Sequence, residues 1–336
     1  MTQDTLATVP PDALPERPAR RLTAATVKLF AIRNSMLLVM AFVILYFVVS
    51  SPLFATVNNV QSILLAAAPF ALIAFGQTLV ILTGGIDLSV GSVIALSAMV
   101  AAWVSLRTPD QLWIAFAAAI GAGIVVGLIN GLLVAVFNVP PFIATLALLT
   151  GASGLAYVIG NGAPINGLPA SYGDLAKFEL AGLQFPVIVM IVGFVILAVV
   201  MRRTIFGTRI YAIGGNAEAS RIAGIKVPRV LLSVYVISGG LAAISGILLS
   251  SRVIAGTPSL GSGYELDAIA AVVIGGASLM GGRGTMWGTL VGLLLIQTLN
   301  NGLDLLLVPS YWQSVIKGVL IATAVSVDVY ASRRRR

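Results

Sequence analysis

Six polar side chains interrupt long apolar stretches of the sequence, where they can form hydrogen bonds or, for the one acid, bind a proton or substrate. These residues are Gln77, Asp87, Asn130, Gln297, Asn300 and Asn301. An unpaired polar group in an apolar environment is unfavourable, so each needs a partner on a neighbouring helix or a polar solute between the helices. For Asp87, a further alternative is that it caps the following helix at the membrane surface. The sequence leaves these alternatives open.

The residues that carry most enzyme chemistry are absent. The chain has no cysteine and no histidine, which excludes thiolate nucleophiles, disulfides, imidazole bases and the usual zinc ligands. It also lacks a Gly-x-x-x-x-Gly-Lys-Ser/Thr phosphate loop, the motif that cradles nucleotide phosphates. We therefore expect no catalytic residue, no metal site and no cofactor, and any ATP hydrolysis must come from a separate polypeptide.

The composition places these residues in a membrane protein. Of the 336 residues, 58% are hydrophobic and 10% are charged, and the mean hydropathy is +1.02, which is more apolar than a globular core can hide. The surplus must face lipid, so the sequence predicts an all-α, polytopic bundle of transmembrane helices.

Apolar length and turn signals predict about ten spans. Their approximate ranges are 34–50, 61–82, 88–105, 112–136, 141–160, 184–201, 230–251, 265–280, 285–300 and 311–328. The third, eighth and ninth spans are short and contain glycine, so they are the candidates for a broken or re-entrant segment. Between the fifth and sixth spans, residues 161–183 are rich in turn residues, and we expect a partly ordered external cap.

The basic residues predict the orientation of the chain. The N-terminal tail, the loop 202–229, Arg283 and the C-terminal arginines hold 16 of the 20 Lys and Arg residues on one side, and the other side receives Arg107, Lys177 and Arg252. The positive-inside rule then places both termini in the cytoplasm. The formal charge of +8 reports this topology and not a nucleic-acid partner. Lys317, inside the last span, either snorkels to the outer interface or pairs with an acid such as Asp304.

Three parts follow along the chain. Residues 1–33 are expected to form a cytoplasmic tail ahead of an uncleaved signal anchor, residues 34–330 the transmembrane domain, and residues 331–336 a basic cytoplasmic end. Within the domain, the cytoplasmic segment 202–229 is long enough to do more than connect. Asn216 can cap a helix of about two turns, Glu218 suits its positive end, and Gly224 can stop it before Pro228.

This segment resembles the coupling segment of the ribose, xylose and galactose permease family of bacterial ABC importers. The family pattern Gly-Asn-x-x-Ala-x-x-x-x-Gly-Ile matches Gly215, Asn216, Ala219, Gly224 and Ile225. Three further stretches share the resemblance: Leu82 to Ser92 (LTGGIDLSVGS), Asn138 to Leu146 (NVPPFIATL) and Ala271 to Thr285 (AVVIGGASLMGGRGT). Four ordered motifs within one topology are specific, whereas a single Gly-Gly turn would be weak. Without the resemblance, the segment could equally be a solvated basic loop.

The resemblance implies the permease subunit of an ABC importer in the bacterial inner membrane, translocating a pentose or hexose. It implies a cytoplasmic ABC ATPase, a periplasmic sugar-binding protein and a second copy of the permease as partners, besides the lipid bilayer. The coupling residues it implies are Gly214, Gly215, Asn216, Glu218, Ala219, Ser220, Gly224 and Ile225. The six polar residues named first become the candidates for the translocation path.

Other functions stay open at this point. A related ABC permease for a nucleoside, an autoinducer sugar or a branched-chain amino acid would share the architecture. An ion-coupled secondary transporter usually has an ionisable residue or a broken helix near mid-membrane, whereas Asp267 and Lys317 are predicted nearer the span ends. A membrane anchor or scaffold would need neither an ATPase nor a binding protein.

The basic residues generate a testable topology. Reporter fusions after Met1 and after Arg336 should both report the cytoplasm, because the excess of Lys and Arg marks the side that is not translocated. A fusion at Lys177 serves as the periplasmic control. A periplasmic signal from either terminus would contradict the orientation and would move segment 202–229 to the wrong compartment.

Overall fold

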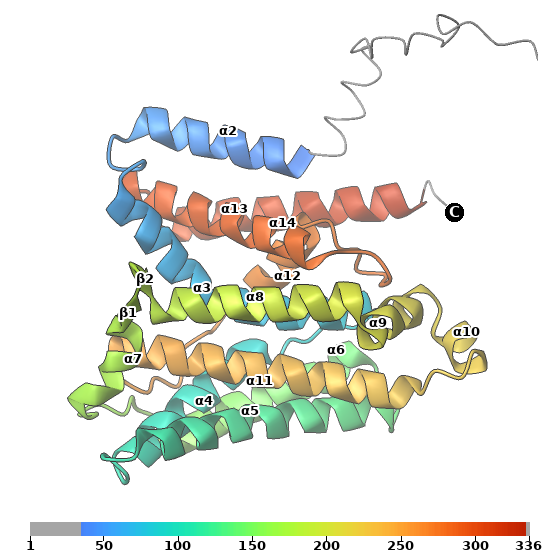
Figure 1. The fold of residues 1–336 in the computed structure, drawn as a ribbon, viewed down its shortest axis with the longest axis horizontal. Coiled ribbons are helices and arrows are strands. Elements are labelled where there is room, and N and C mark those ends of the chain that lie inside the picture. The colour runs from blue at the N-terminus through green and yellow to red at the C-terminus, as the bar shows by residue number, and fades with distance from the viewer. Residues whose placement is uncertain (1–34, 334–336) are drawn as a thin grey trace, which may run out of the picture.

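Each apolar segment forms one helix, because a helix satisfies its own backbone hydrogen bonds where lipid offers none. The computed structural model describes residues 35–333, so the expected tail 1–33 and residues 334–336 lie outside the described part. The ten helices that match the predicted spans are α2 (Ser35–Ser50), α3 (Val57–Leu82), α4 (Val90–Ser105), α5 (Leu112–Ala135), α6 (Pro141–Ile159), α8 (Phe185–Arg203), α11 (Val227–Val253), α12 (Tyr264–Ile274), α13 (Met286–Leu305) and α14 (Ser310–Arg333). They lie side by side in one bundle (Figure 1).

Ten helices do not make ten full crossings. Within the described residues, five helices are long and apolar enough to cross a membrane, namely α3, α5, α6, α8 and α11. Helix α12 has 11 residues and is therefore roughly 16 Å long, about half of a 30 Å hydrocarbon core. The eighth predicted span is thus a short helix instead of a crossing, and the count of ten crossings is not confirmed.

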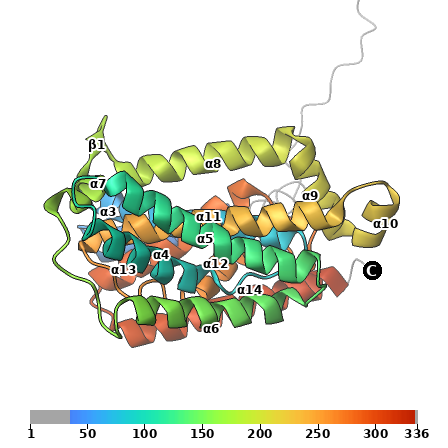
Figure 2. The same ribbon diagram turned by 90° about the horizontal axis from the view of Figure 1, so that it is seen from below.

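The long helix α3 is the centre of the bundle. Every residue from Ala67 to Leu82 is buried, and α3 packs against α8, α11, α12 and α13. Helices α4, α5 and α11 form the other half of the core, with α6 outside α4. Figure 2 shows α6 and α8 on opposite sides of the bundle, which explains why their outer apolar faces remain exposed.

Helices α5 and α11 touch through their backbones at glycine residues. A Cβ on Gly123 would collide with Ala243 and the carbonyl oxygen of Gly239, and a Cβ on Gly239 would collide with the Gly123 carbonyl. Gly127 meets the Tyr235 carbonyl in the same way. Small residues allow such close approach between membrane helices, where dispersion replaces the hydrophobic effect as the source of affinity.

The two ends of the bundle carry different structures (Figure 1). At one end, the segment between α6 and α8 forms η2 (Ala170–Gly173), α7 (Asp174–Lys177) and the antiparallel strands β1 (Glu179–Leu180) and β2 (Leu183–Gln184). The Tyr172 hydroxyl lies 2.7 Å from Ser250 Oγ, and Ser251 Oγ donates to the Tyr172 carbonyl at 2.7 Å. The predicted partly ordered cap is therefore confirmed. The opposite end carries α9 (Ile205–Gly215) and α10 (Ala217–Ile222).

The glycine contacts between α5 and α11 generate a stability prediction. Gly239→Ala should lower the melting temperature of the detergent-solubilised protein, because the methyl group meets backbone that cannot move aside, at a cost of about 1–3 kcal/mol. The matched control is Gly151→Ala in α6, where nothing lies within 4 Å of the added Cβ. Equal melting temperatures for the two variants would show that α5 and α11 are not held by this contact.

Candidate coupling site and translocation path

The predicted coupling helix forms as the sequence indicates. Asn216 caps α10, with its Oδ1 accepting from the Ala219 N–H at 2.9 Å, and Ser220 Oγ donates to the Asn216 carbonyl at 2.8 Å. Gly224 has φ of +83°, the left-handed conformation that ends helices and that side chains disfavour. Helix α9, which precedes α10, was not among the predicted elements.

The outer surface of α10 combines exposed apolar residues with one exposed ion pair. Ile222 is 83% exposed, and Ala217, Ala219 and Ala223 are exposed beside it. Glu218 and Arg221 form a solvent-exposed ion pair at 3.4 Å, which contributes little to stability. Ser220 is buried and Ile225 packs against the core, so these two residues position α10 and do not offer a contact surface.

Behind α10, α9 is joined to the bundle by a backbone junction. Gly282 N–H donates to the Leu82 carbonyl at 2.9 Å, and Tyr211 Oη donates to the Gly284 carbonyl at 2.9 Å. A Cβ on Gly214 would collide with the Leu82 carbonyl and the Gly282 nitrogen, whereas Gly215 has open space around it. The end of α9 therefore lies directly against the end of α3 and the loop before α13. We call these contacts the glycine junction.

Three of the six polar candidates meet in one buried cluster. Asp87 is 1% exposed, and Gln77 and Asn130 are fully buried. Asp87 Oδ1 accepts from Ser89 N (2.9 Å) and Ser89 Oγ (2.6 Å), and Oδ2 accepts from Ser238 Oγ (2.9 Å).

Gln77 and Asn130 complete this cluster. With its amide oriented to satisfy both contacts, Gln77 donates to the Asp87 carbonyl (3.0 Å) and accepts from the Asp87 N–H (3.2 Å). Asn130 Nδ2 donates to Ser89 Oγ at 2.8 Å. Asp87 is buried, and its carboxylate accepts from the Ser89 N–H where α4 begins, as in the capping alternative. Its position relative to the membrane surface stays a prediction. The cluster supports the helix-to-helix alternative for all three residues.

The other three candidates lie along α13. Asn301 and Asn59 exchange two hydrogen bonds of 2.9 Å, which joins α13 to α3. Gln297 and Asn300 are half-buried, and Asn300 Oδ1 is buried without a partner among the described residues. Nearby, Lys317 pairs with Asp267 at 3.0 Å, while Asp304 accepts from Gln313. Asp304 as the partner of Lys317 was therefore wrong.

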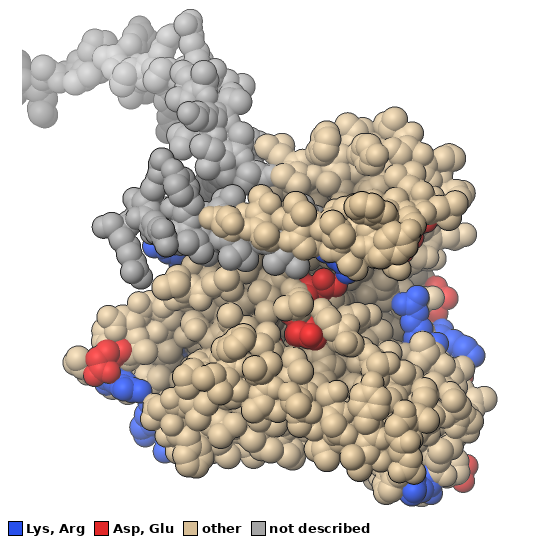
Figure 3. Space-filling view, turned by 180° about the vertical axis from the view of Figure 1, so that it is seen from behind, with Lys and Arg blue, Asp and Glu red and all other residues tan. Residues whose placement is uncertain are grey.

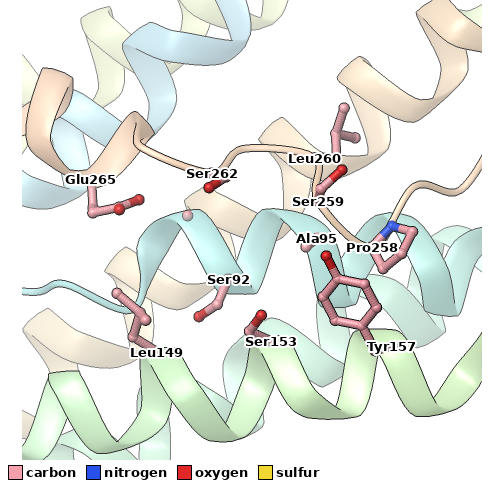
Figure 4. Close-up of a pocket in the computed structure, with 11 residues that line it drawn as sticks. Ser92, Ala95, Leu149, Ser153, Tyr157, Pro258, Ser259, Leu260, Ser262 and Glu265 are labelled. Carbon is pink, nitrogen blue, oxygen red and sulfur yellow. The ribbon is translucent and has the colours of Figure 1, made fainter. Parts of the chain in front are cut away.

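A polar pocket that the sequence did not reveal lies where α4 and α12 begin. Its volume is about 100 Å³, and its polar lining consists of Ser92, Ser153, Tyr157, Ser259, Ser262 and Glu265. Figure 4 shows Ser92 on α4 opposite Ser153 and Tyr157 on α6, with Glu265 at the start of α12. The segments that line the pocket are far apart in sequence, so their proximity could not be predicted. The only sequence feature that could have indicated the pocket is the acidic residue Glu265 within a short apolar segment.

The surface of the bundle agrees with a membrane location. Figure 3 shows one face that is largely uncharged, with Lys, Arg, Asp and Glu gathered at its two ends and acidic side chains in a hollow near its middle. The bundle, its apolar faces and its broken inner helices define a polytopic membrane protein of the transporter class.

Comparison with known proteins identifies the class more closely. Residues 59–325 match the family model described as branched-chain amino acid transport system / permease component, and the chain belongs to this permease family. It is 48% identical to the ribose import permease protein RbsC of Bacillus subtilis over 280 residues, covering 83% of this chain and 87% of that protein.

Two further relatives have similar coverage. RbsC of Escherichia coli K12 is 45% identical over 282 residues, covering 83% of this chain and 88% of the relative. The L-arabinose ABC transporter permease protein AraH of Azospirillum brasilense is 36% identical over 301 residues, covering 89% and 88%. No solved structure matches the chain.

The buried cluster generates a prediction about its role. Asp87→Ala should lower the amount of folded protein in the membrane, because Ser89 and Ser238 would lose their shared acceptor in the interior, where an unsatisfied polar group costs about 1–3 kcal/mol. Asp110→Asn at an exposed position is the control and should leave abundance unchanged. Transport per folded molecule separates the alternatives: normal abundance with abolished transport would instead place Asp87 on the path.

Proposed function

We propose that the chain is the membrane-spanning permease subunit of an ATP-driven importer for a pentose or hexose, delivered by a periplasmic binding protein. The observation that carries the proposal is the exposed apolar residues of α10, above all Ile222, together with the contact of the preceding helix α9 with the end of α3. The names of the relatives, ribose and arabinose permeases, favour a sugar as the substrate.

The coupling end suits a cytoplasmic ATPase. Exposure of an apolar side chain such as Ile222 to water is unfavourable. Apolar residues on one face of a helix commonly bind in a groove of a partner protein. Segment 202–229 is also the most basic loop of the chain, so the positive-inside rule places α10 on the side where ATP is available. We expect two copies of the permease around one path, with both termini in the cytoplasm.

The glycine junction gives α10 a way to act on the spans. Helix α9 contacts the end of α3 through backbone atoms at Gly214, and backbone cannot move aside as a flexible side chain can. A displacement of α10 by the ATPase would therefore shift the end of α3 and the loop 281–284. Such differential contact in two states is what couples a partner's ATP cycle to helix opening.

The proposal has two steps, docking of the ATPase on α10 and transmission of its motion to the spans. Each step is tested by its own substitutions. Ile222→Asp and Ala219→Arg should reduce co-purification of the ATPase by about tenfold or more, because a charge must be desolvated in the interface. Thr208→Asp places a similar charge at an exposed position of α9 and is the control. Normal co-purification and normal sugar uptake for both α10 variants would make this segment an ordinary loop.

Gly214→Ala tests transmission in the same cells. The added methyl group collides with the Leu82 carbonyl, so ATPase binding should persist while sugar uptake per ATPase complex falls. Gly215→Ala is the matched control, because its Cβ meets nothing within 4 Å. Uptake equal to the control would show that the glycine junction is not a transmission element.

A further inference from the structure

We propose that the pocket between α4, α6 and residues 258–265 binds hydroxyl groups of the sugar in transit, with Glu265 as its principal acceptor. This assignment rests on the proposed function and adds the residues that contact the substrate within the bundle. None of the six polar residues singled out from the sequence lines this pocket.

The pocket exists because two short helices begin at the same place. Helix α4 starts at Val90 and α12 at Tyr264, and a Cβ on Gly91 would collide with the Glu265 carboxylate and lie 2.7 Å from the Gly261 carbonyl. From there the helices run in opposite directions. Gly256 contacts Ala102 near the end of α4, whereas the loop after α12 reaches Leu82 and Gly214. The Glu265 carboxylate thus lies in the interior and not at an end of the bundle.

The lining has the chemistry of a site for a neutral polyol. A carboxylate accepts hydrogen bonds, and the hydroxyls of four serines and one tyrosine both donate and accept. Among the described residues, no Lys or Arg lines the pocket, so an anionic or zwitterionic solute would find no partner there for its negative charge. The ring of Tyr157 stands over the pocket beside Pro258 (Figure 4), and such apolar surface can pack against the C–H face of a sugar ring.

The pocket is too small to enclose a whole sugar, which suits a transient contact during transport. Its volume of about 100 Å³ is well below the roughly 300–1,000 Å³ of pockets that enclose a ligand. It can therefore hold one face of a sugar, while the other face points to the open side of the pocket. Partial contact gives weak binding, which permits release.

Glu265 also has a local structural contact, which the experiment must separate from substrate binding. Its carboxylate lies against the backbone at the start of α4, where a Cβ on Gly91 would collide with it. Glu265→Gln retains one oxygen for this contact and nearly the same volume, but removes the charge that strengthens a bond to a sugar hydroxyl. The substitution is therefore conservative for folding and severe for the proposed site.

The test uses the whole importer in proteoliposomes, reconstituted with its proposed binding protein and ATPase, and D-ribose as the probe. The readout is sugar transported per ATP hydrolysed, with melting temperature measured alongside. Glu265→Gln should lower this ratio by about tenfold, the loss expected for one charge-assisted hydrogen bond, while ATPase stimulation by the loaded binding protein stays near normal. Glu179→Gln on exposed strand β1 is the matched carboxyl-to-amide control.

Two further variants decide the outcome if Glu265→Gln fails to fold. Tyr157 is 44% exposed, so Tyr157→Ala should leave stability intact and lower the ratio, and Tyr157→Phe should lower it less. Ratios equal to wild type for Glu265→Gln, or for both Tyr157 variants if the former does not fold, would overturn the assignment and leave the proposed function standing. A wild-type complex that imports neither pentose nor hexose would overturn the proposed function, and this assignment with it.

Discussion

The structure depends on how backbone and side-chain polar groups are satisfied where helices stop inside the bundle. Lipid and apolar side chains offer no hydrogen bonds, so an interrupted helix is tolerated only where protein groups complete it. Between α3 and α4, the Gln77 amide pairs with both backbone groups of Asp87, and the Asp87 carboxylate binds Ser89 and Ser238. This cluster replaces the missing helical hydrogen bonds, and it fixes the start of α4.

The same interruption connects the interior to the coupling end. The segment before α4 leaves α3 at Gly84, and the segment after α12 returns past Gly281 and Gly282, which pack against Gly84 and Gly214. Both short helices, α4 and α12, are therefore attached, through a few residues, to the glycine junction. A displacement of α9 would reach the starts of α13 and α4 together, and hence the pocket between α4 and α12, without passing through lipid-facing helices. The path from the coupling helix to the pocket in the proposed mechanism is therefore short.

Features set by local sequence could be predicted, and features set by contacts between distant segments could not. Apolar runs located every main helix, and Asn216 and Gly224 located α10, because hydropathy and capping act within a few residues. The partner of Lys317 was wrong, since Asp267 is 50 residues away in sequence. The same holds for the cluster of Gln77, Asp87 and Asn130 and for the pocket at Glu265. Each combines helices that are distant in sequence, and hydropathy does not reveal how deep in the bundle those helices lie.

Because α12 lies inside the bundle, each of its acidic side chains needs a compensating positive charge or dipole. Asp267 is compensated by Lys317 at 3.0 Å, whereas no basic residue in the described part of the chain lines the pocket with Glu265. Its nearest compensation comes from the N-terminal ends of α4 and α12, whose backbone N–H groups carry partial positive charge. Dipoles stabilise a carboxylate without occupying it as a salt bridge would, so its oxygens remain free to accept hydroxyl groups. A lysine in the same place would instead have favoured charged solutes, and the absence of one from the lining is why a neutral sugar fits this site best.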